Sequence, residues 1–127
     1  MIKVAAGIIK RNGKYLAARR AQGKHMAGKW EFPGGKIEAG ETPEQCLVRE
    51  LKEEFQIEVS VGPHVADSIF DYGNKVICLM GYLVVHLHGQ FSLQDHDQIA
   101  WLSVDEMFEY DFAPADIPLI QALASHP

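Results

Sequence analysis

The pattern of apolar and polar positions predicts a series of short strands. Residues 4–11 and 14–20 are apolar-rich runs separated by Asn12-Gly13, which is a strong signal for a β-hairpin. A short strand from Trp30 to Phe32 is predicted to end at the turn residues Pro33-Gly34-Gly35. Alternating or continuous apolar positions predict further strands over 57–62, 75–89 and 99–104.

The clearest helix follows the double glycine. Thr42 suits the N-cap position, Pro43 suits the first helical position, and Gln45 completes a capping box with Thr42. Nothing interrupts this helix before Phe55. At about 100° per residue, its predicted core-facing stripe consists of Leu47, Val48, Leu51 and Phe55.

Two further helices are predicted near the end of the chain. Ser103 and Glu106 form a capping box for a short helix, and residues 114–124 form a closing helix with an early proline. Mixed strands flanked by two or three helices predict an α+β fold or an α/β sandwich. Because no linker or repeat divides the chain, we expect a single domain over residues 1–127.

Composition excludes several classes of protein. A content of 47% hydrophobic and 23% charged residues is typical of a folded globular chain. No apolar run approaches the roughly 20 residues of a membrane span. Cys46 and Cys78 stand alone, without a CxxC pair, which favours a reduced, cytoplasmic protein. A net charge of −5 argues against binding to duplex nucleic acid. We expect a monomer or a weak homodimer.

Acidic residues concentrate on one segment, residues 34–54. Glu50, Glu53 and Glu54 have i, i+3 and i+4 spacing, where like charges repel by a few tenths of a kcal/mol each. A charge run of this kind is usually a solvated helix face. Here, however, the carboxylates border the apolar stripe and look toward the loop with Glu41 and the double glycine. Oxygen-only ligands of this type suit Mg²⁺ or Mn²⁺.

The spacing in this segment resembles the Nudix box. Five residues separate Gly35 from Glu41, and seven more separate Glu41 from the run that begins at Arg49. The positions that match the box are Gly35, Glu41, Arg49, Glu50, Leu51, Glu53, Glu54 and Ile57. Gln56 departs from the pattern, because the family has glycine there to end the helix in a left-handed conformation.

The resemblance implies a set of roles around the phosphates. Nearly the whole chain is similar to the MutT branch, which hydrolyses nucleoside triphosphates to monophosphate and pyrophosphate. The family fold that this resemblance implies is an α/β/α sandwich around a mixed sheet. By resemblance, Glu50, Glu53 and Glu54 bind the metal together with the Gly34 carbonyl. Glu50 or Glu53 would be the catalytic base. Arg49 would orient the carboxylates, and Glu41 would support the loop by pairing with it.

The resemblance also implies a nucleotide pocket, lined by Arg20, His25, Phe32, Gly35 and Asp116. For Phe32 a core position is an equal alternative, and for His25 an exposed loop position is the stronger one. Asp95 precedes the last strand and is a candidate for an extra ligand or base.

The substrate prediction rests on Asp116, where MutT carries asparagine. An ionised aspartate only accepts hydrogen bonds, so it would favour an exocyclic amino group, as on guanine or cytosine. We rank 8-oxo-dGTP first from the overall MutT resemblance, and CTP or modified dCTP second because of the "APADIPL" ending. The alternative of another class is a non-catalytic nucleotide-sensing module.

Overall fold

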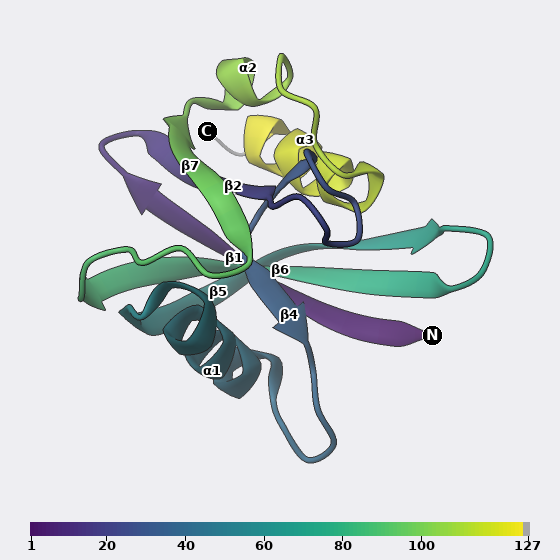
Figure 1. Cartoon of the computed structure of the whole chain (residues 1–127), viewed down its shortest axis with the longest axis horizontal. Coiled ribbons are helices and arrows are strands. Elements are labelled where there is room, and N and C mark those ends of the chain that lie inside the picture. Colours follow the sequence, from purple (N-terminus) through teal and green to yellow (C-terminus); the bar gives the residue numbers. More distant parts are fainter. Residues whose placement is uncertain (126–127) are drawn as a thin grey trace.

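The computed structural model describes residues 1–125, which form a mixed sheet between two layers of helices (Figure 1). Helix α1 covers one side of the sheet, and α2 and α3 lie on the other. The helical elements are α1 (Pro43–Phe55), α2 (Val104–Met107), the 3-10 turn η1 (Pro114–Asp116) and α3 (Ile117–Ser125). The strands are β1 (Ile2–Arg11), β2 (Lys14–Arg20), β3 (Trp30–Glu31), β4 (Gly34–Lys36), β5 (Glu58–Asp71), β6 (Val76–His88) and β7 (His96–Leu102).

Strand β1 is the centre of the sheet. The strand order is β3-β2-β1-β6-β5, with β4 paired to β1 and β7 paired to β2. The β1–β6 pairing is parallel, and the other pairs are antiparallel. Through the Ala5–Gly35 and Ala6–Gly34 pairs, β1 fixes the double glycine at the middle of the molecule, directly before the helix that carries the acidic residues.

Two hydrophobic cores hold the layers together. Leu47, Leu51 and Phe55 of α1 are fully buried against one face of the sheet, and Leu119 and Ile120 of α3 are buried against the other. The predicted α/β/α sandwich is therefore confirmed. Among residues 1–125, no helix is long and apolar enough to cross a membrane.

The local signals at turns and helix ends are also confirmed. Asn12 and Gly13 both have positive φ, as a two-residue hairpin requires. Both capping boxes form, Thr42 with Gln45 and Ser103 with Glu106. The short final helix is split, because residues 114–116 wind as a 3-10 turn before α3.

Three local predictions were wrong. Val48 is 47% exposed, and Cys46 takes its place in the core, because the buried stripe of α1 is rotated toward β4. Strand β5 continues to Asp71 instead of ending at residue 62, since pairing with β6 overrides the Gly62-Pro63 break through local register shifts. Gly34 and Gly35 form a short strand instead of a turn, because β1 offers them backbone partners.

Helix α1 ends at Gln56, the position where the Nudix box has glycine. Gln56 has φ 57° and ψ 35°, and its backbone N–H donates to the Lys52 carbonyl. The left-handed helix end is thus kept with an ordinary L-residue, at a conformational cost of about 1 kcal/mol.

We expect Gln56→Gly to stabilise the protein by up to about 1 kcal/mol, because Gln56 is exposed and glycine removes the cost of positive φ. Urea unfolding measures the change, and Gln56→Ala, which keeps the strain, is the matched control. Equal stability of the glycine and alanine variants would contradict this account.

Candidate active site

Arg49 organises the charged surface of α1. Its Nε and Nη2 donate to the two Glu41 carboxylate oxygens at 2.7 and 2.9 Å, and its Nη1 donates to Glu50 Oε1 at 2.7 Å. A further bond joins Nη2 to the Lys36 carbonyl at 3.2 Å. The guanidinium holds the pKa of Glu41 down to about 2. The predicted pairing of Arg49 with Glu41 is present, and it ties the loop to the helix.

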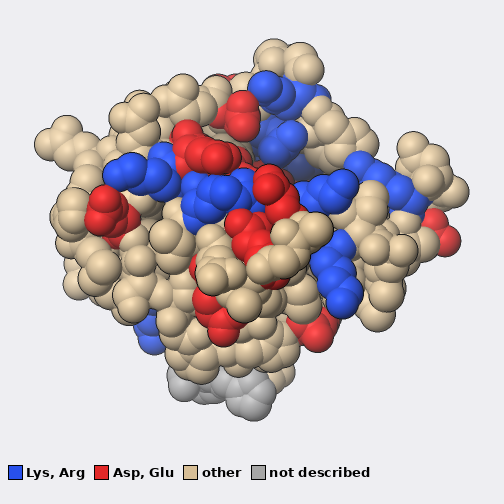
Figure 2. Space-filling model, turned by 90° about the horizontal axis from the view of Figure 1, so that it is seen from below, with Lys and Arg blue, Asp and Glu red and all other residues tan. Residues whose placement is uncertain are grey.

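Charge on this face alternates over short distances. Figure 2 shows acidic and basic groups interleaved on the face seen from the α1 side of Figure 1. Besides Glu41 and Glu50, the Arg49 guanidinium lies within 4 Å of Glu38 and Glu53. The cluster is therefore partly neutralised from within, by an arginine that stays charged at all relevant pH values.

The three clustered carboxylates of α1, those of Glu50, Glu53 and Glu54, have very different surroundings. The Glu53 side chain is 61% exposed and meets Arg49 Nη1 only at 3.5 Å. Glu50 is half-buried, and burial raises its pKa despite the Arg49 contact. Its carboxylate occupies the space where a Gly35 side chain would stand, so any side chain at position 35 would displace the Glu50 carboxylate.

Glu54 is the buried member of the set. Its Oε1 has no hydrogen-bond partner among the described residues. Burial, with the charges of Glu31, Glu50 and Asp95, raises its pKa to about 9. A carboxyl group buried without a donor, beside other carboxylates, fits a hard divalent cation that would supply the missing positive charge.

The described residues do not converge on a finished metal site. Within residues 1–125, no three His, Cys, Asp or Glu side chains are grouped closely enough to hold an ion. Glu53 points to solvent and Glu50 is bonded to Arg49. The assignment of Gly34, Glu50, Glu53 and Glu54 as ligands stays a prediction, which the chemistry of Glu54 supports.

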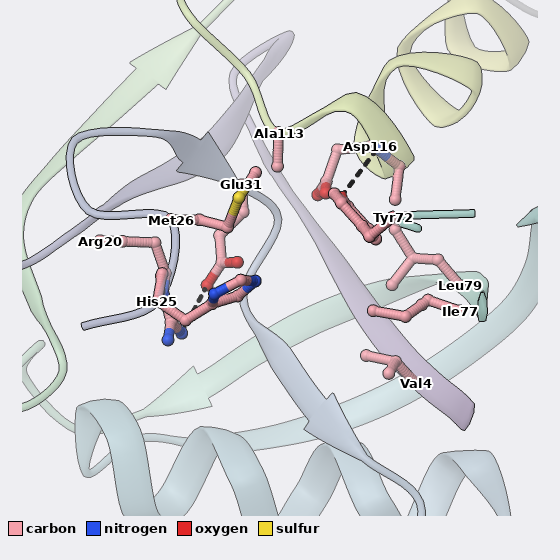
Figure 3. A pocket seen from close by; sticks show the side chains of 11 residues that line it. Val4, Arg20, His25, Met26, Glu31, Tyr72, Ile77, Leu79, Ala113 and Asp116 are labelled. Atoms are coloured by element: carbon pink, nitrogen blue, oxygen red, sulfur yellow. Dashed lines mark hydrogen bonds and ion pairs between the residues drawn. The ribbon is translucent and has the colours of Figure 1, made fainter. Parts of the chain in front are cut away.

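A cavity of about 170 Å³ is lined in part by Arg20, Glu31 and Asp116. Figure 3 shows Arg20, His25 and Glu31 on one side of it, with Asp116 and Tyr72 on the other. A second hollow of about 130 Å³ continues from it to Gly34 and Gly35. The two share the lining residues Val4, Arg20, Glu31, Leu79 and Asp116. The hollows therefore lead from a polar pocket to the backbone beside Glu50.

The predicted nucleotide residues meet around these hollows. Arg20 and Asp116 line both, His25 lines the first, and Phe32 and Gly35 line the second. The Phe32 ring packs in the core against Phe112, and its backbone N–H donates to Asp116 Oδ2 at 2.9 Å. The Phe32 backbone therefore positions Asp116 in the pocket, while the Phe32 ring is a core side chain, in line with the second of the two predicted alternatives.

Comparison with known proteins agrees with this arrangement. The NUDIX domain matches residues 1–123. The chain belongs to the Nudix family. It is 44% identical to the CTP pyrophosphohydrolase of Escherichia coli K12, over 96% of this chain and 90% of the relative. It is 38% identical to the 8-oxo-dGTP diphosphatase of the same organism, over 96% and 95%.

The solved structures agree as well. The solution structure of the E. coli ORF135 protein superposes with a TM-score of 0.88 at 43% identity, covering 98% of this chain and 89% of that one. The predicted Nudix fold and the prediction that the chain is a Nudix hydrolase are both confirmed.

Asp116 differs from its predicted state. From the sequence, we expect an ionised carboxylate at this position that only accepts hydrogen bonds. In this Nudix fold it is fully buried, and burial together with the nearby Glu31 raises its pKa well above the usual range. A raised pKa favours the neutral carboxyl group, which can donate one hydrogen bond as well as accept, as an asparagine amide also can.

Asp95 also has a partner that the sequence did not indicate. Its carboxylate pairs with Lys24 Nζ at 3.1 Å, and both side chains are half-exposed. The role of Asp95 as an extra ligand or base remains a prediction. A metal ion or a water would have to replace its ion pair with Lys24.

Sequence reasoning missed Glu31 and His96. Glu31 lines both hollows, and its Oε2 lies 2.8 Å from His96 Nε2. Glu31 stands in a strand of two residues, and His96 begins a strand after a polar loop, so neither belongs to a motif. The signal that was available is the polar residue between Trp30 and Phe32, in an otherwise apolar strand.

Glu54 predicts how stability depends on pH. Its pKa in the folded protein, about 9, exceeds the ordinary value of 4.5. Its contribution to stability is therefore complete below the ordinary pKa and is lost as pH rises toward about 9. In metal-free buffer, we expect the Tm to fall between about pH 6 and about pH 9, and Glu54→Gln to reduce that fall.

Thermal melts over this pH range, with and without Mg²⁺ or Mn²⁺, test both the pH dependence caused by Glu54 and its assignment as a metal ligand. The ion should raise the Tm of the wild type more than that of Glu54→Gln, because it stabilises only the state that binds it. Glu44→Gln, on the exposed face of the same helix, is the matched control. Identical pH profiles for wild type and Glu54→Gln would contradict the raised pKa of Glu54. An equal rise in Tm on adding the ion would overturn the assignment of Glu54 as a ligand.

Proposed function

We propose that this Nudix hydrolase converts nucleoside triphosphates to monophosphate and pyrophosphate with Mg²⁺ or Mn²⁺. We further propose that 8-oxo-dGTP is its preferred substrate. The observation that carries the proposal is the continuity of the site. The pocket with Glu31 and Asp116 runs into the hollow at Gly34 and Gly35, and Glu50 lies directly against Gly35. A base in the pocket would leave its phosphates beside the carboxylates of α1.

The residues divide into two groups by chemistry. A bound divalent ion would neutralise phosphate charge and lower the pKa of a bound water. Glu50, Glu53 and Glu54 with the Gly34 carbonyl would hold it, and Glu50 or Glu53 would accept the proton of the attacking water. Arg49 holds Glu50 in place at 2.7 Å. Arg20 lines both hollows and is placed to reach a phosphate or a base edge.

Two carboxyl groups define the base end. Asp116 Oδ2 is occupied by the Phe32 N–H, which leaves the other oxygen for the base. A neutral Asp116 can donate to a ring or carbonyl acceptor, and Glu31 can accept from an exocyclic amino group. Guanine and cytosine supply both partners, whereas thymine and uracil lack the amino group.

Cytosine nucleotides, CTP or modified dCTP, are the second candidate. The 44% identity to a CTP pyrophosphohydrolase favours them. Release of pyrophosphate from a panel of 8-oxo-dGTP, dGTP, CTP, dCTP, UTP and dTTP, with Mg²⁺ and with excess EDTA, separates the candidates. Binding without pyrophosphate release would instead indicate the nucleotide-sensing module, and full activity in EDTA would contradict the metal requirement.

We expect Glu53→Gln to lower kcat by about 10²-fold, on the scale of losing one electrostatic contact in a transition state. Because the Glu53 side chain is 61% exposed, the Tm should stay close to that of the wild type. Steady-state kinetics and a thermal melt give both numbers, with Glu44→Gln as the control on the same helix. A near-wild-type rate would remove Glu53 from the proposed set.

We expect Asp116→Ala to reduce the kcat/KM preference for guanine and cytosine nucleotides over dTTP and UTP by about tenfold or more. In the wild type, a base without the matching partner leaves the Asp116 carboxyl group unpaired, and alanine removes that penalty. Asp116→Asn should keep the preference within about threefold, because the amide retains one donor and one acceptor. The same substrate panel measures both variants. If asparagine flattens the preference as much as alanine does, then Asp116 acts as an ionised acceptor.

A further inference from the structure

His96 is completely buried, but only one of its ring nitrogens has a partner. Nε2 lies 2.8 Å from Glu31 Oε2. Nδ1 faces Glu54 Oε2 at 4.0 Å, too far for a hydrogen bond, and has no other partner among residues 1–125. Burying a polar atom without a partner costs free energy. An apolar side chain would pack here at a lower cost, so the Nε2 contact is the feature that distinguishes histidine at this position.

The ring is held rigidly. It stacks on Phe55 of α1 with centroids 5.2 Å apart and an interplanar angle of 17°. The backbone of His96 pairs with Arg20 in the β2–β7 ladder. Because the sheet fixes one side of the residue and the helix fixes the other, Nε2 presents a donor at a fixed place.

Glu31 needs such a donor. Its charge acts on two other acidic groups, since it contributes to the raised pKa of both Glu54 and Asp116. Its cationic neighbour, Arg20 Nη1, is more distant than His96 Nε2, at 3.5 Å, and Arg20 also donates to the His25 carbonyl. His96 therefore makes the shorter contact and keeps the carboxylate from moving away from the acidic groups around it.

We propose that His96 is a positioning residue that holds the Glu31 carboxylate in the nucleotide pocket, so that base recognition depends on a side chain that does not line either hollow. This inference rests on the proposed function, because Glu31 is the residue assigned to the amino group of the base. His96 acts on KM and on base preference, and it leaves the chemistry at the phosphate end to the carboxylates of α1.

Three substitutions separate this role from simple packing. In His96→Gln the amide nitrogen reaches the place of Nε2, in His96→Asn it reaches only the place of Nδ1, and His96→Phe keeps the ring but has no donor. We expect His96→Phe and His96→Asn to raise the KM for the triphosphate by about tenfold, the scale of a hydrogen bond to a charged group. The Kd for the matching monophosphate, measured without metal, should rise by the same factor. Gln should stay within about threefold, and kcat should change little in all three.

A double-mutant cycle with Glu31→Ala tests whether His96 works through Glu31. In the Glu31→Ala background, His96→Phe should have no further effect on Kd. His64→Asn is the matched control, because His64 forms a similar histidine–carboxylate pair with Asp67 at 2.6 Å on the exposed part of β5. A ¹⁵N NMR spectrum of the wild type, showing a protected Nε2–H that is lost in Glu31→Ala, reports the contact even where a variant folds poorly.

The outcomes distinguish the two proposals. Equal effects of Gln and Asn, additive effects in the cycle, or a Kd that no His96 variant changes would each overturn the role of His96, whether or not triphosphates are hydrolysed. Nucleotide binding that follows the predicted pattern without pyrophosphate release would support the role of His96 and refute the proposed function.

Discussion

The contact between Arg49 and the carboxylates is the interaction on which the site depends. Acidic groups at i, i+3 and i+4 repel one another along a helix, and here they also face an acidic loop. A single guanidinium with five donors binds Glu41 through two bonds and Glu50 through one, and it also reaches the Lys36 carbonyl. The helix, the loop and the double-glycine strand are thereby held in one arrangement before any cation binds.

Near this contact, residues 1–125 bury carboxyl groups that pair with no Lys or Arg side chain. Glu54 and Asp116 are both buried, and the pKa of each is raised by burial and by the charge of Glu31. Such groups reduce stability unless they are protonated or paired. Their presence around the hollows and on α1 is the property expected of a site that exchanges protons for a cation and a polar ligand.

The positions of these groups follow from the sheet. Strand β1 pairs with the double glycine on one side and with β6 on the other, and this places the hollow at Gly34 and Gly35 beside α1. Strand β2 carries Arg20 next to Glu31 of β3 and His96 of β7. Residues that are distant in sequence thus share one polar network, and its rigidity comes from the backbone ladders and from the stacking of His96 on Phe55.

The sequence by itself determined the features that are set by local geometry. The hairpin at Asn12-Gly13, both capping boxes and the spacing from Gly35 to Glu54 depend on neighbours within one or two turns of the chain, so they could be predicted. Periodicity also identified Leu47, Leu51 and Phe55 as core residues, but tertiary structure decided the remaining burial and the contacts between distant side chains. It exposed Val48, extended β5 through Gly62-Pro63, raised the pKa of Asp116 by burial and joined Glu31 to His96, because each of these depends on distant parts of the chain.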